Sequence, residues 1–138
     1  MGEGLSLTAM RVARPVRDLA RALHFYVDII GLEHLGGFAG HDGYDGAFVG
    51  MAASDWHLEL TSHSSGLPRP NPTDEDLLVF YVTADRLRET AAKLAEMGFA
   101  PVDHPNLYWA KVEAAVYRDP DGYNVVFCRE AGLPGQTA

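Results

Sequence analysis

The chemistry in this sequence centres on the segment 56–61 (Trp-His-Leu-Glu-Leu-Thr), in which Glu59 is the only carboxylate. Side chains alternate between the two faces of a strand, so His57, Glu59 and Thr61 share one face if the segment is extended. An imidazole and a carboxylate on one face can hold a metal ion, transfer a proton or orient a polar ligand. Glu59 is the candidate catalytic residue, because an acid among apolar residues needs a partner or a purpose.

The elements that would position these side chains are indicated by a duplication that survives only as spacing. The segments Asp18–Gly31 and Asp85–Gly98 have the same length, and the second follows the first by 67 residues. The same displacement carries Glu59 to Val126. An acid and an aliphatic residue would therefore occupy equivalent positions in two copies of one unit.

Both segments are predicted to be helices, because each carries an apolar stripe at helical spacing between an acidic residue and a glycine. Asp18 is expected to cap the first helix. The glycine-rich segment Gly36–Gly46 lacks the Gly-Lys-Ser/Thr ending of a phosphate loop and is predicted to be a hairpin turn. Strands are predicted at residues 7–16, 47–51, 56–61, 77–82, 99–102, 111–117 and 123–128.

These elements predict an α+β fold made of two β-α-β-β-β modules. Module one covers about residues 7–62 and module two about residues 77–130, which together form one domain. Residues 63–76 contain three prolines and break both periodicities, so they are expected to link the modules. Residues 131–138 are expected to form a frayed tail.

Composition excludes several classes of function. The chain has 138 residues and a formal net charge of −8, with 19 acids against 11 Lys and Arg, which argues against nucleic-acid binding. It has no run of about 18 apolar residues to span a membrane and no signal peptide at its start. We expect a cytoplasmic protein. Cys128 is the single cysteine, so no intrachain disulfide can form, and it is expected to be a small buried residue.

Two motifs carry a family resemblance that covers residues 7–130. Residues 57–61 (His-Leu-Glu-Leu-Thr) and 118–123 (Arg-Asp-Pro-Asp-Gly-Tyr), together with the paired modules, resemble the vicinal oxygen chelate superfamily. That superfamily includes glyoxalase I, bleomycin-resistance proteins, fosfomycin-resistance enzymes and extradiol dioxygenases. The segment 106–109 (Asn-Leu-Tyr-Trp) is similar to small bacterial members. The resemblance implies an open, barrel-like sheet that curls around a cleft, and a homodimer.

In metal-using members, the ligands come from the first and last strands of each module. The matching positions here are Arg11 and Glu59 in module one, and Leu77 (or Leu78) and Val126 in module two. An arginine stays protonated and has no lone pair for a metal. The resemblance therefore predicts no metal and no cofactor, and an ion pair between Arg11 and Glu59 at the usual metal position.

Several of these residues have a second interpretation. His57 either contacts a ligand or bonds to a strand neighbour, and Arg11 either pairs with Glu59 or extends to solvent. Tyr108 and Trp109 either close over a small-molecule cleft, pack beneath a loop or belong to a dimer interface. Of the remaining histidines, His34, His41 and His104 are expected in turns and His63 at the start of the linker, all solvated. His24, beside the stripe of the first helix, is expected to be structural.

Three functions remain open from the sequence. The first is a binding protein that holds a small, mostly apolar or aromatic molecule, with Arg11, His57 and Glu59 as polar groups and with Leu77, Tyr108, Trp109 and Val126 around it. The second is an enzyme of the same superfamily, either a metal-dependent lyase, transferase or dioxygenase, or a metal-free isomerase with Glu59 as base. The third is a domain that acts through a protein partner.

Overall fold

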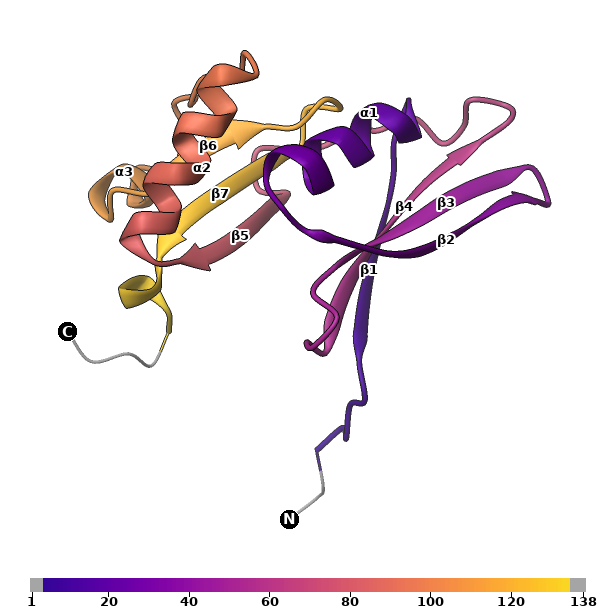
Figure 1. Cartoon of the computed structure of the whole chain (residues 1–138), viewed down its shortest axis with the longest axis horizontal. Helices are drawn as coiled ribbons and strands as arrows, with labels where there is room; N and C mark the ends of the chain where they lie inside the picture. Colours follow the sequence, from indigo (N-terminus) through magenta and orange to yellow (C-terminus); the bar gives the residue numbers. More distant parts are fainter. Residues whose placement is uncertain (1–3, 135–138) are drawn as a thin grey trace. The chain divides into compact units, whose positions relative to one another are not determined.

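The computed structural model describes residues 4–134, which form a mixed α+β structure with two sheets and few helices (Figure 1). Unit 1 ends at Pro70 and unit 2 begins at Asn71, a division that falls within the predicted linker. Each unit has one sheet, and each is described by itself below.

Unit 1 contains a four-stranded sheet with the order β1-β4-β3-β2, in which β1 is parallel to β4 and the other pairs are antiparallel. Apolar residues on one sheet face are buried together with the helical segment. They include Val49 and Leu58, with Phe25 and Tyr26 from the helical segment. The elements are β1 (Met10–Pro15), α1 (Leu19–Leu23), the π-helical η1 (His24–Ile29), β2 (Glu33–His41), β3 (Tyr44–Gly50) and β4 (Trp56–His63).

Both predicted ends of the first helical segment are confirmed. Asp18 accepts a hydrogen bond from the backbone N–H of Arg21 at 3.1 Å, and Gly31 follows the helix with a φ of +86°. That left-handed conformation favours glycine. The continuation from α1 into a π-helical turn was not predicted, because an apolar stripe does not distinguish these two helical windings.

The predicted turn at Gly36–Gly46 is wrong in extent. Residues up to His41 belong to β2, and the turn is limited to Asp42 and Gly43, whose φ values of 52° and 87° suit a two-residue hairpin. Two register irregularities accompany the glycines of β2, which has φ +150° at Gly36 and φ +63° at Gly40. Glycine clusters here mark bulges within a strand rather than a loop.

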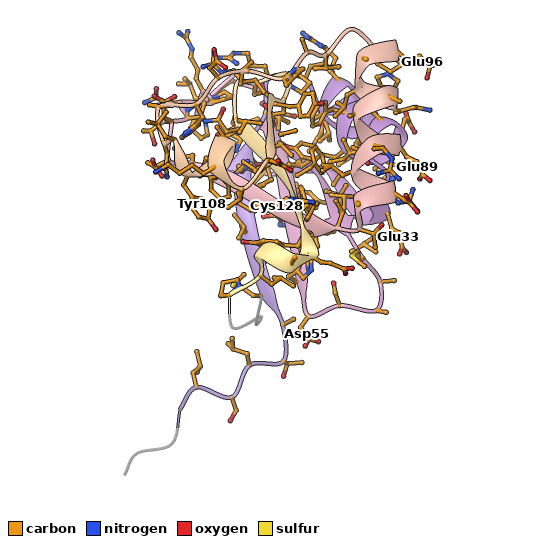
Figure 2. The ribbon with its side chains drawn as sticks, turned by 90° about the vertical axis from the view of Figure 1, so that its left-hand side faces the viewer. Glu33, Asp55, Glu89, Glu96, Tyr108 and Cys128 are labelled. Atoms are coloured by element: carbon orange, nitrogen blue, oxygen red, sulfur yellow. The ribbon has the colours of Figure 1, made fainter. Side chains whose placement is uncertain are left out.

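Unit 2 contains a three-stranded sheet with the order β5-β7-β6, in which β5 is parallel to β7 and β6 is antiparallel to it. Helix α2 lies beside this sheet in Figure 1, and Figure 2 shows Glu89 and Glu96 projecting from its outer side. The elements are β5 (Leu77–Val82), α2 (Ala84–Glu96), α3 (Tyr108–Lys111), β6 (Ala115–Arg118), β7 (Asn124–Arg129) and the 3-10 turn η2 (Glu130–Gly132).

Unit 2 departs from the predicted β-α-β-β-β order in two places. Residues 99–102 form no strand. The strand predicted at residues 111–117 begins only at Ala115, because Lys111 ends helix α3 and residues 112–114 connect α3 to β6. Val102 alone donates a backbone hydrogen bond to Val116, at 2.8 Å. Pro101 has no N–H, which prevents a continuous ladder beside β6.

The two predicted helices also begin differently. Asp18 caps α1, whereas Thr83 caps α2 by accepting from the N–H of Arg86 at 3.2 Å, and Asp85 lies in the first turn. Gly98 has a φ of +87° after α2, as Gly31 has after the first helical segment. The equal spacing of the acids is therefore a similarity of sequence without equal structural roles. Residues 135–138 of the predicted tail lie outside the described residues, and residues 130–132 form η2.

Candidate functional site

Strands β1 and β4 bring Arg11, His57 and Glu59 onto one face of the unit 1 sheet. Arg11 is directly opposite His57 in the parallel register, and Ala13 is opposite Glu59. The Arg11 Nε atom donates a hydrogen bond to His57 Nε2 at 2.9 Å, and Arg11 Nη1 lies 3.6 Å from Glu59 Oε2. The predicted ion pair is therefore present. The side chain of Arg11 is 49% exposed and that of Glu59 is 17% exposed, so the pair is only partly removed from water.

The bond between Arg11 and His57 fixes the form of the imidazole. A guanidinium can only donate, so His57 Nε2 must present its lone pair and the ring proton must be on Nδ1. This lone pair is the one that a divalent metal would use through Nε2. In this geometry the arginine already engages it.

Phe48 completes the group, and the sequence analysis did not identify it. It lies opposite Glu59 on β3, and the Arg11 Cζ atom is 4.6 Å from the centre of its ring, within cation–π range. The His57 ring meets Phe48 edge to face at 5.9 Å. We call Arg11, Phe48, His57 and Glu59 the Arg11 cluster. The alternation of β3 could have indicated Phe48, had the pairing of β3 with β4 been known.

Glycine makes room for a second aromatic ring on this face. A Cβ atom at Gly46 would lie 2.4 Å from Cζ of Phe38, so the Phe38 ring lies directly over the glycine. The rings of Phe38 and Phe48 are 5.9 Å apart. The sheet face beside the Arg11 cluster therefore combines one cation, one acid, one neutral imidazole and aromatic surface, which is a chemistry for orienting a small organic molecule.

In unit 2, Leu77 and Val126 lie on neighbouring strands and have no polar side-chain atoms. Leu77 pairs with Asn124, and Val126 pairs with Val79. Val126 is fully buried, and Leu77 is half-buried. Leu77 lies opposite Asn124 in a parallel pair, as Arg11 lies opposite His57.

Tyr108 and Trp109 lie side by side on the short helix α3. Tyr108 is 47% exposed and lies at the outer side of unit 2 in Figure 2, and its ring meets that of Trp109 edge to face at 5.1 Å. The helix start is ordered by Asn106, whose Oδ1 accepts from the N–H of Tyr108 at 3.0 Å. Trp109 is half-buried, and its Nε1 has no hydrogen-bond acceptor among the described residues.

Asn124 is a second residue that the sequence analysis missed. It is 3% exposed, and its Nδ2 donates to the carbonyl oxygen of Asp74 at 3.1 Å. The signal was in the sequence, because the displacement of 67 that connects Glu59 with Val126 also connects His57 with Asn124.

The prediction of turns is wrong for His34 and His41, although both side chains are exposed as expected. His34 and His41 lie within β2. His104 is bonded through both ring nitrogens, because Nε2 is 2.6 Å from the Asp74 carbonyl oxygen and Nδ1 accepts from the N–H of Asn106 at 3.0 Å. It joins the 104–106 loop to the start of unit 2 and is a structural histidine.

The buried side chains of Tyr117 and Cys128 have shifted pKa values, and neither belongs to the Arg11 cluster. Burial raises the pKa of the Tyr117 hydroxyl. Burial also raises the pKa of the Cys128 thiol, although Arg129 lowers it in part. Cys128 is 1% exposed, as expected for a buried filler, and Figure 2 places it within the ribbon of unit 2.

Residues 4–134 contain no group of three or more His, Cys, Asp or Glu side chains placed to hold a metal ion. Over the same described residues, no helix is long and apolar enough to cross a membrane.

Comparison with known proteins agrees with this architecture. A model of the YycE-like N-terminal domain matches residues 10–61, and a model of the YycE-like C-terminal domain matches residues 75–129. The chain is 38% identical over 128 residues to the curated protein YycE of Bacillus subtilis (strain 168), covering 92% of this chain and 91% of that protein. The chain belongs to the YycE-like family. This membership, together with structural neighbours described as glyoxalase and fosfomycin resistance proteins, agrees with the resemblance to the vicinal oxygen chelate superfamily.

Solved structures place the YycE-like fold among its relatives. A 2.0 Å crystal structure of a Bacillus subtilis YycE protein of unknown function, with a suggested glyoxalase/fosfomycin resistance role, has a TM-score of 0.84 and 36% identity and covers 94% of each chain. The trypanothione-dependent glyoxalase I of Leishmania major has a TM-score of 0.72 and 21% identity, covering 91% and 88%. TnmS3, an antibiotic binding protein from Streptomyces sp. CB03234, has a TM-score of 0.58 and 24% identity, covering 94% and 98%. The last two show a shared fold.

Proposed function

We propose that this YycE-like protein binds a small organic molecule through the Arg11 cluster, without the metal that related enzymes use. The observation that carries the proposal is the guanidinium of Arg11, which bonds to His57 Nε2 at 2.9 Å and lies 3.6 Å from Glu59. A cation at this position repels a divalent ion and engages the imidazole lone pair. The same cation over Phe48 can orient an aromatic ligand that carries a polar or anionic group.

The proposal includes two equivalent modules. In both sheets the first strand is parallel to the last, and the penultimate strand is antiparallel to the last. Arg11 opposite His57 matches Leu77 opposite Asn124. On this basis Leu77, Val126, Tyr108 and Trp109 are proposed as ligand-binding residues of the second module. The open, barrel-like sheet around a cleft, the single domain, the homodimer and the cytoplasmic location expected from the sequence are part of this proposal.

The alternative is a metal-dependent lyase, transferase or dioxygenase of the same superfamily. His57 and Glu59 are two donors on one sheet face, and Arg11 is exposed enough to move away from them. The likeness of fold to a glyoxalase I supports this alternative only as an analogy.

Elemental analysis decides between the two. Protein purified without a polyhistidine tag and dialysed against metal-free buffer is assayed for Zn, Ni, Mn, Fe and Co, and each ion is then added back in a calorimetric titration. We expect far less than one metal per chain and no saturable binding. Near-stoichiometric metal that is lost in Glu59→Gln would contradict the proposal and support the enzyme.

Ligand binding is tested with 8-anilinonaphthalene-1-sulfonate, an aromatic anion whose fluorescence reports binding. Arg11→Ala removes the cation and is expected to weaken probe binding about tenfold, the effect of losing a charged hydrogen bond. Arg86→Ala, which removes an exposed arginine of α2 that pairs with Glu89, is the control and should change nothing. Equal binding by both variants would contradict the role of the Arg11 cluster.

A further inference from the structure

Asn124 has a buried acceptor that the fold leaves unused. Asn124 is 3% exposed at the start of β7, and its Oδ1 has no hydrogen-bond donor within the described residues. Native proteins leave few buried polar atoms unsatisfied, and each such atom calls for an explanation. A binding role is one such explanation, because a ligand can supply the missing partner.

The orientation of the Asn124 amide follows from chemistry. The carbonyl oxygen of Asp74 only accepts, so the Asn124 atom 3.1 Å from it must be the nitrogen. His104 Nε2 also donates to this carbonyl oxygen, at 2.6 Å, and His104 Nδ1 accepts from the N–H of Asn106 at 3.0 Å. The amide cannot flip without losing its bond to Asp74, so Oδ1 faces away from that carbonyl.

The neighbouring strand positions supply no donor for this oxygen. Leu77 is opposite Asn124 on β5, and Val126 is the next residue of β7 on the same face, so both neighbours are aliphatic. Arg118, the partner of Asn124 on β6, is exposed and does not donate to Oδ1. Oδ1 is therefore an unpaired polar atom whose strand neighbours Leu77 and Val126 are apolar, and small-molecule sites combine a few polar atoms with apolar side chains in this way.

We propose that Asn124 is a ligand-binding residue whose Oδ1 accepts a hydrogen bond from a neutral hydroxyl or N–H group on an otherwise apolar small molecule. Asn124 corresponds in register to His57, which accepts from Arg11 in unit 1, whereas Leu77 in the place of Arg11 donates nothing. The ligand supplies the donor that the chain lacks here. This inference goes beyond the Arg11 cluster and does not depend on it.

The test compares phenol, which has a hydroxyl donor, with anisole, in which a methyl group replaces that hydrogen. Binding is followed by ¹⁵N–¹H NMR of the side-chain amides, which is simple because the chain has three asparagines, Asn71, Asn106 and Asn124. We expect phenol to shift the Asn124 amide in a saturable manner with a Kd at least fivefold lower than that of anisole. The amides of Asn71 and Asn106 serve as internal controls and should not shift.

Asn124→Leu removes the acceptor at similar volume, and with binding followed through the backbone N–H signals of the neighbouring residues Val125 and Val126 it should reduce the preference for phenol to about one. Because that variant also loses the bond to Asp74 and could unfold, Asn124→Ser, which keeps an acceptor oxygen, is measured beside it. An unshifted Asn124 amide, or equal affinity for phenol and anisole, would overturn the inference. Binding of 8-anilinonaphthalene-1-sulfonate in the same samples reports on the Arg11 cluster, so failure of the proposed function is seen separately.

Discussion

At the scale of single residues, Arg11 decides the chemistry of its sheet face. His57 and Glu59 alone would be two donors for a divalent ion, but the guanidinium uses the imidazole lone pair and balances the carboxylate. The two acceptors thereby become a polar anchor with no net charge. A partly exposed pair of this kind contributes at most about 1 kcal/mol to stability, so its loss should affect the proposed binding more than folding.

Arg11→His should convert this face into a metal site. The substitution releases His57 Nε2 and adds a second imidazole directly opposite it, which gives three donors of the type that Zn²⁺ prefers. We expect Zn²⁺ to raise the melting temperature of this variant and to leave that of the unmodified protein unchanged. The control, Arg11→Ala, lacks the third donor. A Zn²⁺ response as large in Arg11→Ala as in Arg11→His would show that the arginine is not what prevents metal binding.

Tyr117 should make the protein sensitive to alkaline pH. Its side chain is 3% exposed, and burial raises its pKa above the ordinary value of 10.0, so the folded chain holds the proton more tightly than the unfolded chain. The resulting stability is complete below pH 10 and is lost as the pH rises from about 10 towards the raised pKa, by up to about 1.4 kcal/mol per pH unit.

Urea unfolding between pH 8 and pH 11 checks this expectation. Tyr117→Phe should show a smaller loss of unfolding free energy above pH 10 than the unmodified protein. Tyr44→Phe removes a hydroxyl from an exposed side chain and should follow the unmodified protein. Identical slopes for Tyr117→Phe and the unmodified protein would mean that another group titrates.

At the scale of elements, the Asp-Pro-Asp-Gly motif acts as a turn. Asp119 is 5% exposed, and its Oδ1 accepts from the backbone N–H groups of Asp121 and Tyr123 at 2.8 and 3.0 Å. Gly122 adopts a φ of +90° and donates to the Asp119 carbonyl at 3.0 Å. The motif thus connects β6 to β7 and sets where Asn124 begins β7.

Asp119→Ala should therefore destabilise the protein by about 1–3 kcal/mol, because two buried N–H groups lose their acceptor. Chemical denaturation measures the loss, and Asp103→Ala, at an exposed position, provides the comparison. Asp119→Asn keeps an acceptor oxygen and should lose less. A change below 0.5 kcal/mol, taken as about the size of a surface substitution, would contradict the structural role of Asp119.

Elements with a strong apolar pattern were predictable, and those governed by single backbone atoms were not. Leu77–Val82 matches the predicted strand, since a continuous apolar run between turn residues is typical of a strand. The missing strand at 99–102 depends on the absent N–H of Pro101, and the strand through Gly36 depends on bulges that glycine permits. The pattern of apolar and polar side chains therefore predicts neither the missing strand at 99–102 nor the continuous strand through Gly36.

At the scale of the whole molecule, the sequence revealed the charged residues proposed to bind a ligand but not the aromatic and amide residues. The pairing of Arg11 with Glu59 was predictable, because the family resemblance names the strand positions that meet. Phe48 and Asn124 were missed, since their roles depend on strand pairing and on which buried atoms remain unsatisfied. Charged residues are conspicuous in an apolar segment, whereas a phenylalanine or an asparagine in a strand is not.

Self-association should depend on the edge of the unit 1 sheet. Strand β1 is an edge strand of its sheet, and its residues Met10 and Val12 are 53% and 37% exposed. An edge strand with exposed apolar side chains is prone to pair with another chain, and lysine on such an edge prevents it.

The proposed homodimer predicts a particle of twice the 15.0 kDa chain mass in sedimentation analysis. Val12→Lys should shift the equilibrium towards the single chain, whereas Met97→Lys, at a position 42% exposed outside β1, should not. A dimer unaffected by Val12→Lys would exclude this edge as the contact, and a single chain in the unmodified protein would contradict the homodimer itself.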